Sequence, residues 1–205
     1  MKIGIMGGTF DPIHNGHLII GEYSRTSLNL DKVIFIPSGI HPFKENKNIT
    51  LSNKRLDMIS LAIKSNPNFE LSSIEIDRKG ITYTVDTILD LKKDYEKDEI
   101  YFIIGSDIPF QIEKWKDFHV LIHLVKFILF NRTGQDNEEI NNKIKELESL
   151  YEIQLEKIQS PLIEISSTEI RDRVKNKLSI KYLVPESVEE YILKNNLYIG
   201  DDIDG

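Results

Sequence analysis

Residues 1–17 read MKIGIMGGTFDPIHNGH, an apolar run followed by a glycine-rich turn. The apolar run, residues 2–6, has the length of a strand, and the residues from Gly16 onward have the period of a helix. A strand, a tight turn and a helix in this order form the first βα unit of many parallel sheets. The N-terminus therefore predicts a sheet with a turn at the edge where open α/β sheets bind ligands.

The rest of the chain continues to alternate strand-length apolar blocks with helical segments. Two blocks, residues 33–36 and 101–104, are continuously apolar, as expected for parallel strands buried on both faces. The expected strands are residues 2–6, 32–37, 69–76, 100–105, 126–130 and 162–165. The expected helices are residues 16–28, 52–65, 85–96, 138–150, 167–175 and 186–195. We therefore predict an α/β fold: a doubly wound, Rossmann-like, mostly parallel sheet with helices on both faces.

The composition is that of an ordinary folded domain. Hydrophobic residues make up 40% and charged residues 29% of the 205 residues, which excludes a disordered, collagen-like or membrane-embedded chain. A domain commonly has about 150 residues, so we expect one domain over residues 1–205. Within it, residues 133–160 are rich in Asn, Glu, Lys and Gln, which predicts an exposed insertion made of a helix and a loop. Residues 200–205 are expected to form a flexible tail.

Charge and cysteine content narrow the function classes. The net charge of −7 disfavours binding to a nucleic acid polymer or an anionic membrane. The chain has no cysteine, which excludes disulfides, thiolate nucleophiles and cysteine-ligated zinc and favours a reducing, cytoplasmic location. The longest apolar run, residues 120–130, is shorter than the roughly 20 residues that a membrane-spanning helix needs.

The turn after the first strand has the residue types of a phosphate site. Gly7 and Gly8 allow backbone amides to approach an anion without a Cβ in the way, and the Thr9 hydroxyl can donate a hydrogen bond to the same group. The chain has no P-loop G-x-x-x-x-G-K-[S/T] and no G-x-G-x-x-G fingerprint. The phosphate site predicted here is therefore of another type.

Two histidines follow the glycines. His14 and His17 lie three residues apart, on one side of the first turn of the helix expected from Gly16, whose positive dipole end faces the crevice. Both imidazoles could donate to phosphoryl oxygens. One alternative is an ordinary glycine turn followed by surface histidines. A histidine-pair metal site is a second alternative, although no third ligand is apparent nearby.

A second phosphate-type motif reads ISSTEIR at residues 165–171. Ser166 and Glu169 fit the S-x-x-E capping box, which predicts that a helix begins there. Arg171 lies one turn into that helix, and an arginine beside a helix N-terminus makes a charged phosphate clamp. Helix capping alone is the alternative role of this motif.

These motifs together resemble those of a known family. GGTFDPIHNGH, residues 7–17, resembles the (T/H)xGH signature of the nucleotidylyltransferase superfamily, and residues 1–199 are similar to bacterial nicotinate-nucleotide adenylyltransferases. Residues 165–171 resemble the superfamily's second ATP motif, and residues 105–107, GSD, resemble the family's G-x-D. TYTVDT at residues 82–87, with the later Trp115, resembles its nicotinate pocket.

The resemblance implies the nucleotidylyltransferase fold and an activity. The activity is transfer of AMP from ATP to nicotinate mononucleotide, which gives nicotinate adenine dinucleotide and pyrophosphate in NAD biosynthesis. Its partners are then ATP and the mononucleotide, with Mg²⁺ accompanying ATP, and a homo-oligomer is one expected assembly. Alternatives are a transferase for another phosphorylated acceptor, such as phosphopantetheine, and a non-catalytic nucleotide-sensing module of the same fold. A tRNA synthetase fragment is disfavoured by the acidic charge.

The resemblance also implies roles for individual residues. The catalytic residues it implies are His14, His17, Lys44 and Arg171. The ATP-binding residues it implies are Gly7, Gly8, Thr9, Phe10, His14, Gly16, His17, Gly105, Asp107, Ser166, Ser167 and Arg171. The residues it implies for the mononucleotide are Lys44, Thr84 and Trp115, and it assigns no protein ligand to a metal.

Several of these side chains could instead serve the fold or the surface. Trp115 lies between Lys114 and Lys116, so either a ring face is open for stacking or the indole packs in the core. Thr84 and Asp107 could instead cap helices. Lys44 could be a solvated loop lysine, and its loop departs from the family pattern P-P-H-K.

The expected chemistry needs no nucleophile from the protein. A phosphate monoester has a second pKa near ~6, so the acceptor is mostly dianionic at pH 7 and can attack the α-phosphorus directly. We expect His17 to stabilise the α-phosphate in the transition state and His14 and Thr9 to position phosphates. Lys44 and Arg171 are expected to neutralise the polyphosphate.

Overall fold

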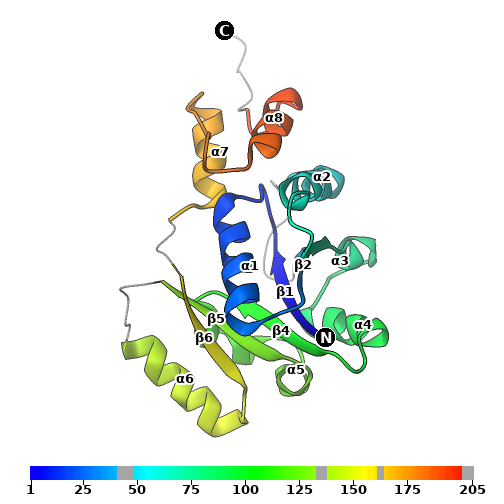
Figure 1. The fold of residues 1–205 in the computed structure, drawn as a ribbon, viewed down its shortest axis with the longest axis vertical. Helices are drawn as coiled ribbons and strands as arrows, with labels where there is room; N and C mark the ends of the chain where they lie inside the picture. Colours follow the sequence, from blue (N-terminus) through cyan, green and yellow to red (C-terminus); the bar gives the residue numbers. More distant parts are fainter. Residues whose placement is uncertain (41–48, 133–137, 161–163, 200–205) are drawn as a thin grey trace.

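A computed structural model describes residues 1–40, 49–132, 138–160 and 164–199. One six-stranded sheet runs through them (Figure 1), in the order β3-β2-β1-β4-β5-β6, and all of its pairings are parallel. The strands are β1 (Lys2–Gly8), β2 (Lys32–Pro37), β3 (Phe69–Leu71), β4 (Glu99–Ile104), β5 (Lys126–Arg132) and β6 (Leu155–Ser160). The strand order reverses between β1 and β4. The predicted doubly wound, Rossmann-like sheet is therefore confirmed.

Helices cover both faces of this sheet. They are α1 (Asn15–Leu28), α2 (Ser52–Ile63), α3 (Ile74–Asp77), α4 (Thr84–Asp94), α5 (Phe118–Leu124), α6 (Glu138–Tyr151), α7 (Ser167–Lys175) and α8 (Glu186–Lys194), with short 3₁₀ turns η1 (Ile108–Phe110) and η2 (Ile112–Lys114). One apolar cluster joins the sheet to α2, α7 and α8, with α1 packed against it. A second cluster joins the opposite face to α4, α5 and α6.

Strand β2 illustrates why the central strands are continuously apolar. Val33 and Phe35 belong to one cluster, whereas Ile34 and Ile36 belong to the other. Successive side chains of a strand point to opposite faces, so a strand covered on both sides must be apolar at every position. The predicted bounds of β2 and of α7 agree with those observed.

Two strand predictions are wrong in position. The strand expected at residues 69–76 ends at Leu71, and the short helix α3 follows. The last strand is Leu155–Ser160 rather than residues 162–165, of which residues 162 and 163 lie outside the described ranges. Since β6 is an edge strand with the mixed sequence LEKIQS, its apolar signal is weaker than that of the following PLIEI.

The segment at residues 133–160 is more closely joined to the sheet than expected. Helix α6 buries Ile140, Ile144 and Leu147, and β6 pairs with β5 along six residues. Glu138 and Glu139 on the polar face of α6 are exposed. The part of the segment that follows α6 contains β6, which completes the sheet.

Candidate active site

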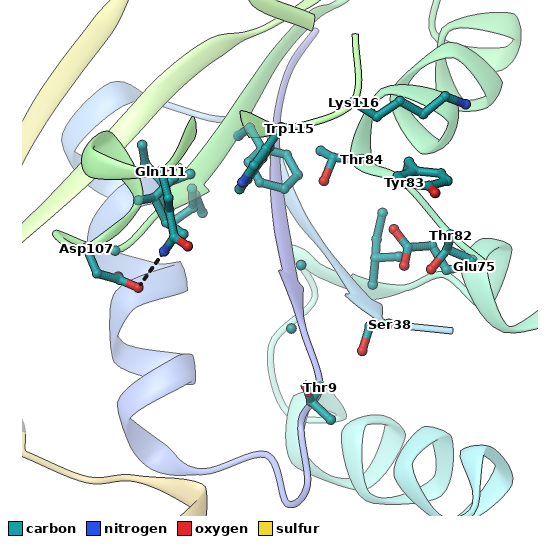
Figure 2. A pocket seen from close by; sticks show the side chains of 18 residues that line it. Thr9, Ser38, Glu75, Thr82, Tyr83, Thr84, Asp107, Gln111, Trp115 and Lys116 are labelled. Carbon is teal, nitrogen blue, oxygen red and sulfur yellow. Dashed lines mark hydrogen bonds between the residues drawn. The ribbon is translucent and has the colours of Figure 1, made fainter. Parts of the chain in front are cut away.

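A pocket opens at the carboxyl ends of β1 and β4, where the strand order reverses (Figure 2). Its volume is about 470 Å³, within the range of small-molecule sites. The turn after β1, the loop after β4 and the start of α4 form its walls. Seven residues predicted from the sequence line it: Gly7, Gly8, Thr9, Thr84, Gly105, Asp107 and Trp115. Five of the predicted ATP residues and two of the predicted mononucleotide residues therefore share one crevice, whereas His14, His17, Ser166, Ser167 and Arg171 are not among the residues that line it.

The glycine turn is shaped by Phe10. This residue has a φ of 50°, in the left-handed region, and its ring is 2% exposed. A Cβ on Gly8 would lie 3.1 Å from the Phe10 ring, closer than most side chains approach, so any larger residue there would push against the buried ring. Because Phe10 as a whole residue is buried, it shapes the turn from the core and does not line the pocket.

His14 and His17 form a stacked pair at the start of α1. Their ring centroids lie 3.7 Å apart at an interplanar angle of 25°. The backbone N–H of His14 donates to Nδ1 of His17 at 3.2 Å, so a neutral His17 carries its proton on Nε2 and can donate it outward. Gly16 is buried between them in the first turn of the helix.

Both imidazoles are held in the neutral form. Burial lowers the pKa of His14 to about 4. Burial, and then the proximity of His14, lower the pKa of His17 well below its usual value of 6.5. The side-chain Nδ1 of His14 is buried and has no hydrogen-bond partner among the described residues. The pair is therefore a set of neutral donors and acceptors near pH 7, not a cationic phosphate site.

The two phosphate-type motifs lie side by side, although about 150 residues separate them in the sequence. Ser167 Oγ donates to the backbone carbonyl of Pro12 at 2.9 Å, and Arg171 Nη1 donates to the backbone carbonyl of Asp11 at 2.7 Å. The N-cap Ser166 accepts from the backbone N–H of Glu169 at 3.1 Å, as the capping box predicts. The N-terminus of α7 is thus docked against the turn that precedes α1.

The part of the pocket opposite Thr9 is aromatic and polar (Figure 2). The Trp115 indole meets the Phe102 ring edge to face, with centroids 6.0 Å apart, and is only partly buried. It therefore contacts the core and also lines the cavity, which combines the two roles expected as alternatives for it. Thr84 is the first residue of α4, so the unpaired amides of that helix end open into the same space.

Asp107 lies across the pocket from Thr84 (Figure 2) and accepts a hydrogen bond from Gln111 Nε2 at 3.3 Å. A Cβ on Gly105 would lie 2.9 Å from the Asp107 carboxylate, so a larger residue there would displace that side chain. Asp107 is the N-cap residue of η1, but its side chain makes no capping hydrogen bond there. Its carboxylate therefore remains available to a ligand.

One buried residue that supports the site was missed from the sequence. Arg55 of α2 is 4% exposed and donates to the backbone carbonyls of Thr9 (2.8 Å), Ser38 (3.0 Å) and Thr50 (3.1 Å). Burial lowers the pKa of its guanidinium, and the charge of Asp11 opposes that shift. The sequence signal that could have identified Arg55 as buried is its spacing, because it lies three residues before buried Met58, on the same face of the helix.

Other lining residues were also missed, among them Ser38 and Glu75. Gly39, next to Ser38, has no room for a Cβ because the Glu75 carbonyl and the Thr82 side chain lie against it. Lys44, which was predicted to contact both substrates, lies outside the described residues. So do His41 and Phe43, the residues at which its loop departs from the family pattern. None of the helices in the described ranges is long and apolar enough to cross a membrane.

The sheet order, the crevice at its switch point and the paired phosphate motifs define a nucleotidyltransferase, and the chain belongs to the cytidylyltransferase-like family, whose model matches residues 5–173. Within this class it is 46% identical to a protein of Thermoanaerobacter sp. (strain X514) named "Probable nicotinate-nucleotide adenylyltransferase", over 100% of this chain and 98% of that protein. A protein of the same name from Dictyoglomus thermophilum is 47% identical over 97% of this chain and 100% of that protein. The resemblance inferred from the motifs is therefore confirmed.

The fold is shared with a solved structure as well. Plasmodium falciparum nicotinic acid mononucleotide adenylyltransferase complexed with NaAD superposes with a TM-score of 0.76, covering 96% of this chain and 97% of that chain, at 24% sequence identity. At this level of identity the match bears on the fold alone.

Proposed function

We propose that this chain transfers AMP from ATP to nicotinate mononucleotide, giving nicotinate adenine dinucleotide and pyrophosphate as a step of NAD biosynthesis. The observation that carries the proposal is the pocket that joins the turn of Gly7, Gly8 and Thr9 to Trp115 and Thr84. This reaction requires its two substrates to lie next to each other, with ATP bound through its phosphates and the mononucleotide bound through its aromatic base. The curated relatives at 45–47% identity carry the name of this activity.

The reaction is a direct displacement. An oxygen of the mononucleotide phosphate attacks the α-phosphorus of ATP, a new P–O bond forms, and the bond to the bridging oxygen of pyrophosphate breaks. Because the attacking phosphate is already mostly dianionic at pH 7, no general base is needed. Catalysis then depends on alignment and on stabilising charge on the α-phosphoryl oxygens.

His17 supplies the donor to the α-phosphate in this proposal. Its Nδ1 is engaged by the His14 backbone N–H, which leaves the Nε2–H of the neutral ring as the donor. His14 and Thr9 position the triphosphate beside it. A neutral donor keeps its hydrogen through the reaction, so its protonation state does not change as charge develops.

The leaving pyrophosphate is assigned to the start of α7. Ser166 and Ser167 lie at that helix end, where unpaired amides and the positive dipole end favour an anion. Arg171 is docked on the turn through the Asp11 carbonyl, so its guanidinium is held beside the same site. Lys44 is proposed to reach the phosphates from its loop.

The mononucleotide is assigned to the other end of the pocket. The exposed face of Trp115 stacks on the pyridine ring, and the first-turn amides of α4 at Thr84 receive the nicotinate carboxylate. Asp107 accepts hydrogen bonds from ribose hydroxyls.

Nucleotidyltransferases of this kind use ATP and typically a divalent metal ion. We propose Mg²⁺, which prefers oxygen ligands and is commonly bound through substrate phosphates. Among the described residues, no group of three or more His, Cys, Asp and Glu side chains could hold a metal ion. The donors at the turn are amides, a hydroxyl and imidazole N–H groups, and these suit phosphate oxygens that also coordinate the ion. Bound with ATP, Mg²⁺ would offset the negative charge of the triphosphate.

An acceptor panel tests the proposal. Purified protein is given ATP or CTP with Mg²⁺ and one of three acceptors: nicotinate mononucleotide, nicotinamide mononucleotide or phosphopantetheine. We expect pyrophosphate release with ATP and nicotinate mononucleotide. Faster release with phosphopantetheine or CTP would assign another acceptor or donor, and ATP binding without release would indicate a nucleotide-sensing module. A cytoplasmic location, a single domain and a homo-oligomer remain predictions from the sequence.

A further inference from the structure

The end of the described chain returns to the turn that holds the two histidines. Tyr198 lies four residues beyond the end of α8 and has a φ of 62°. Its side chain is part-buried, and its hydroxyl donates to Oδ1 of Asp11 at 2.6 Å. Burial and the neighbouring Asp11 carboxylate raise the pKa of Tyr198, so the phenol keeps its proton across the physiological range.

Asp11 is a junction between distant segments. Its side chain is 4% exposed, and it lies three residues before His14. Its Oδ2 accepts from the backbone N–H of Thr50 at 3.1 Å, and its backbone carbonyl accepts from Arg171 at 2.7 Å. The C-terminal segment, the entry to α2 and the start of α7 therefore all donate to this one residue.

A buried carboxylate is stable only when its oxygens have donors. Without the Tyr198 hydroxyl, Oδ1 of Asp11 loses this donor, and the turn must shift to expose that oxygen to water or to find another donor. A shift of the turn moves His14 and His17 relative to Arg171, and transfer reactions are sensitive to small displacements of this kind.

We propose that Tyr198 is a positioning residue for the transfer reaction: acting through Asp11, it holds the histidine turn in register with Arg171. This proposal rests on the proposed function. It makes the C-terminal segment part of the active-site framework, although Tyr198 does not itself line the substrate pocket.

The chain offers a matched control. Tyr191 of α8 donates to Oδ2 of Asp57 in α2, also at 2.6 Å. This second tyrosine–aspartate hydrogen bond joins the same C-terminal region to the body of the protein but does not involve the turn. Tyr191→Phe therefore removes a tyrosine–aspartate bond of the same length, at an exposed position away from the turn.

Steady-state pyrophosphate release with ATP and nicotinate mononucleotide is compared for the wild type, Tyr198→Phe, Tyr191→Phe, Asp11→Asn and the double variant Tyr198→Phe/Asp11→Asn. We expect Tyr198→Phe to lower kcat about tenfold while the KM of the mononucleotide stays unchanged. Tyr191→Phe is expected to keep wild-type kcat, even if both single tyrosine variants lower the Tm. The double variant should be no slower than Asp11→Asn, since Tyr198 acts through Asp11.

Wild-type kcat in Tyr198→Phe, an equal loss in Tyr191→Phe, or additive losses in the double variant would overturn the proposal. Amide hydrogen exchange gives a reading that does not depend on the reaction. Residues 9–17 should exchange faster in Tyr198→Phe than in Tyr191→Phe, and unchanged exchange there would also overturn it. If the wild type releases no pyrophosphate, the proposed function fails, and the exchange result still decides whether Tyr198 holds the turn.

Discussion

The imidazole rings of His14 and His17 stack with their centroids 3.7 Å apart, and this contact favours neutral rings in both. Two imidazolium groups at that distance would repel each other, and burial disfavours even one of them. Burial lowers the pKa of both rings, and the proximity of His14 lowers that of His17 further. Positive charge for the triphosphate of the proposed reaction must therefore come from groups other than these two rings.

Substitution of His17 tests the assignment of the α-phosphate donor. His17→Ala should lower kcat by about 10² or more, by analogy with the loss of one oxyanion-hole donor. His123, an exposed histidine of α5, provides the control, and His123→Ala should keep the wild-type rate. The measurement is initial-rate pyrophosphate release at saturating substrates. A near-wild-type rate for His17→Ala would remove this role from His17.

Stability should fall on mild acidification. As the pH falls, the imidazole takes up a proton in the unfolded chain but stays neutral in the folded protein. Because the unfolded state then binds more protons than the folded state, the free energy of unfolding decreases. For His14 the window runs from the usual pKa of 6.5 down to about 4, and above 6.5 the residue adds no pH dependence. Urea unfolding across this window measures the effect. His14→Gln should show a smaller decrease than the wild type, and an identical decrease would contradict the prediction.

Trp115 should matter for one substrate more than for the other. Trp115→Ala should raise the KM of the mononucleotide about tenfold, the equivalent of an aromatic stacking contribution of about 1.4 kcal/mol, and change the KM of ATP much less. Phe110→Ala, which removes an exposed ring of η1 outside the pocket lining, serves as the control. Equal changes in both KM values would argue against stacking.

Arg55 should be important for stability, because it donates hydrogen bonds to three backbone carbonyls. Arg55→Gln leaves at least one buried carbonyl without a partner, and each such group costs about 1–3 kcal/mol. We expect the free energy of unfolding to fall by about 3 kcal/mol, measured by urea denaturation. Arg173→Gln provides the comparison, because Arg173 donates to the carbonyl of Ser179 at the surface. Similar losses in the two variants would contradict the argument from burial.

The parallel sheet and most helices could be predicted because their signals are local. The apolar residues of β2 follow one another without a break, and the capping-box residues Ser166 and Glu169 lie three positions apart in the sequence. The prediction was wrong where the local signal was weak, at the edge strand β6 and the short helix α3. Most of the predicted site residues could be named because the family motifs are contiguous in the chain.

The residues proposed to bind or position a phosphate could be nominated from the chain alone, because glycine, threonine, histidine and arginine carry their chemistry in their type and spacing. The contacts that join them could not be read this way. The bonds from Arg171 and Tyr198 to Asp11 span 160 and 187 residues. Those of Arg55 link the turn after β1 to residues at both ends of the connection between β2 and α2. Such contacts form only when the sheet brings distant segments to one edge, since hydrogen-bond geometry between remote residues is set by packing and not by local propensity.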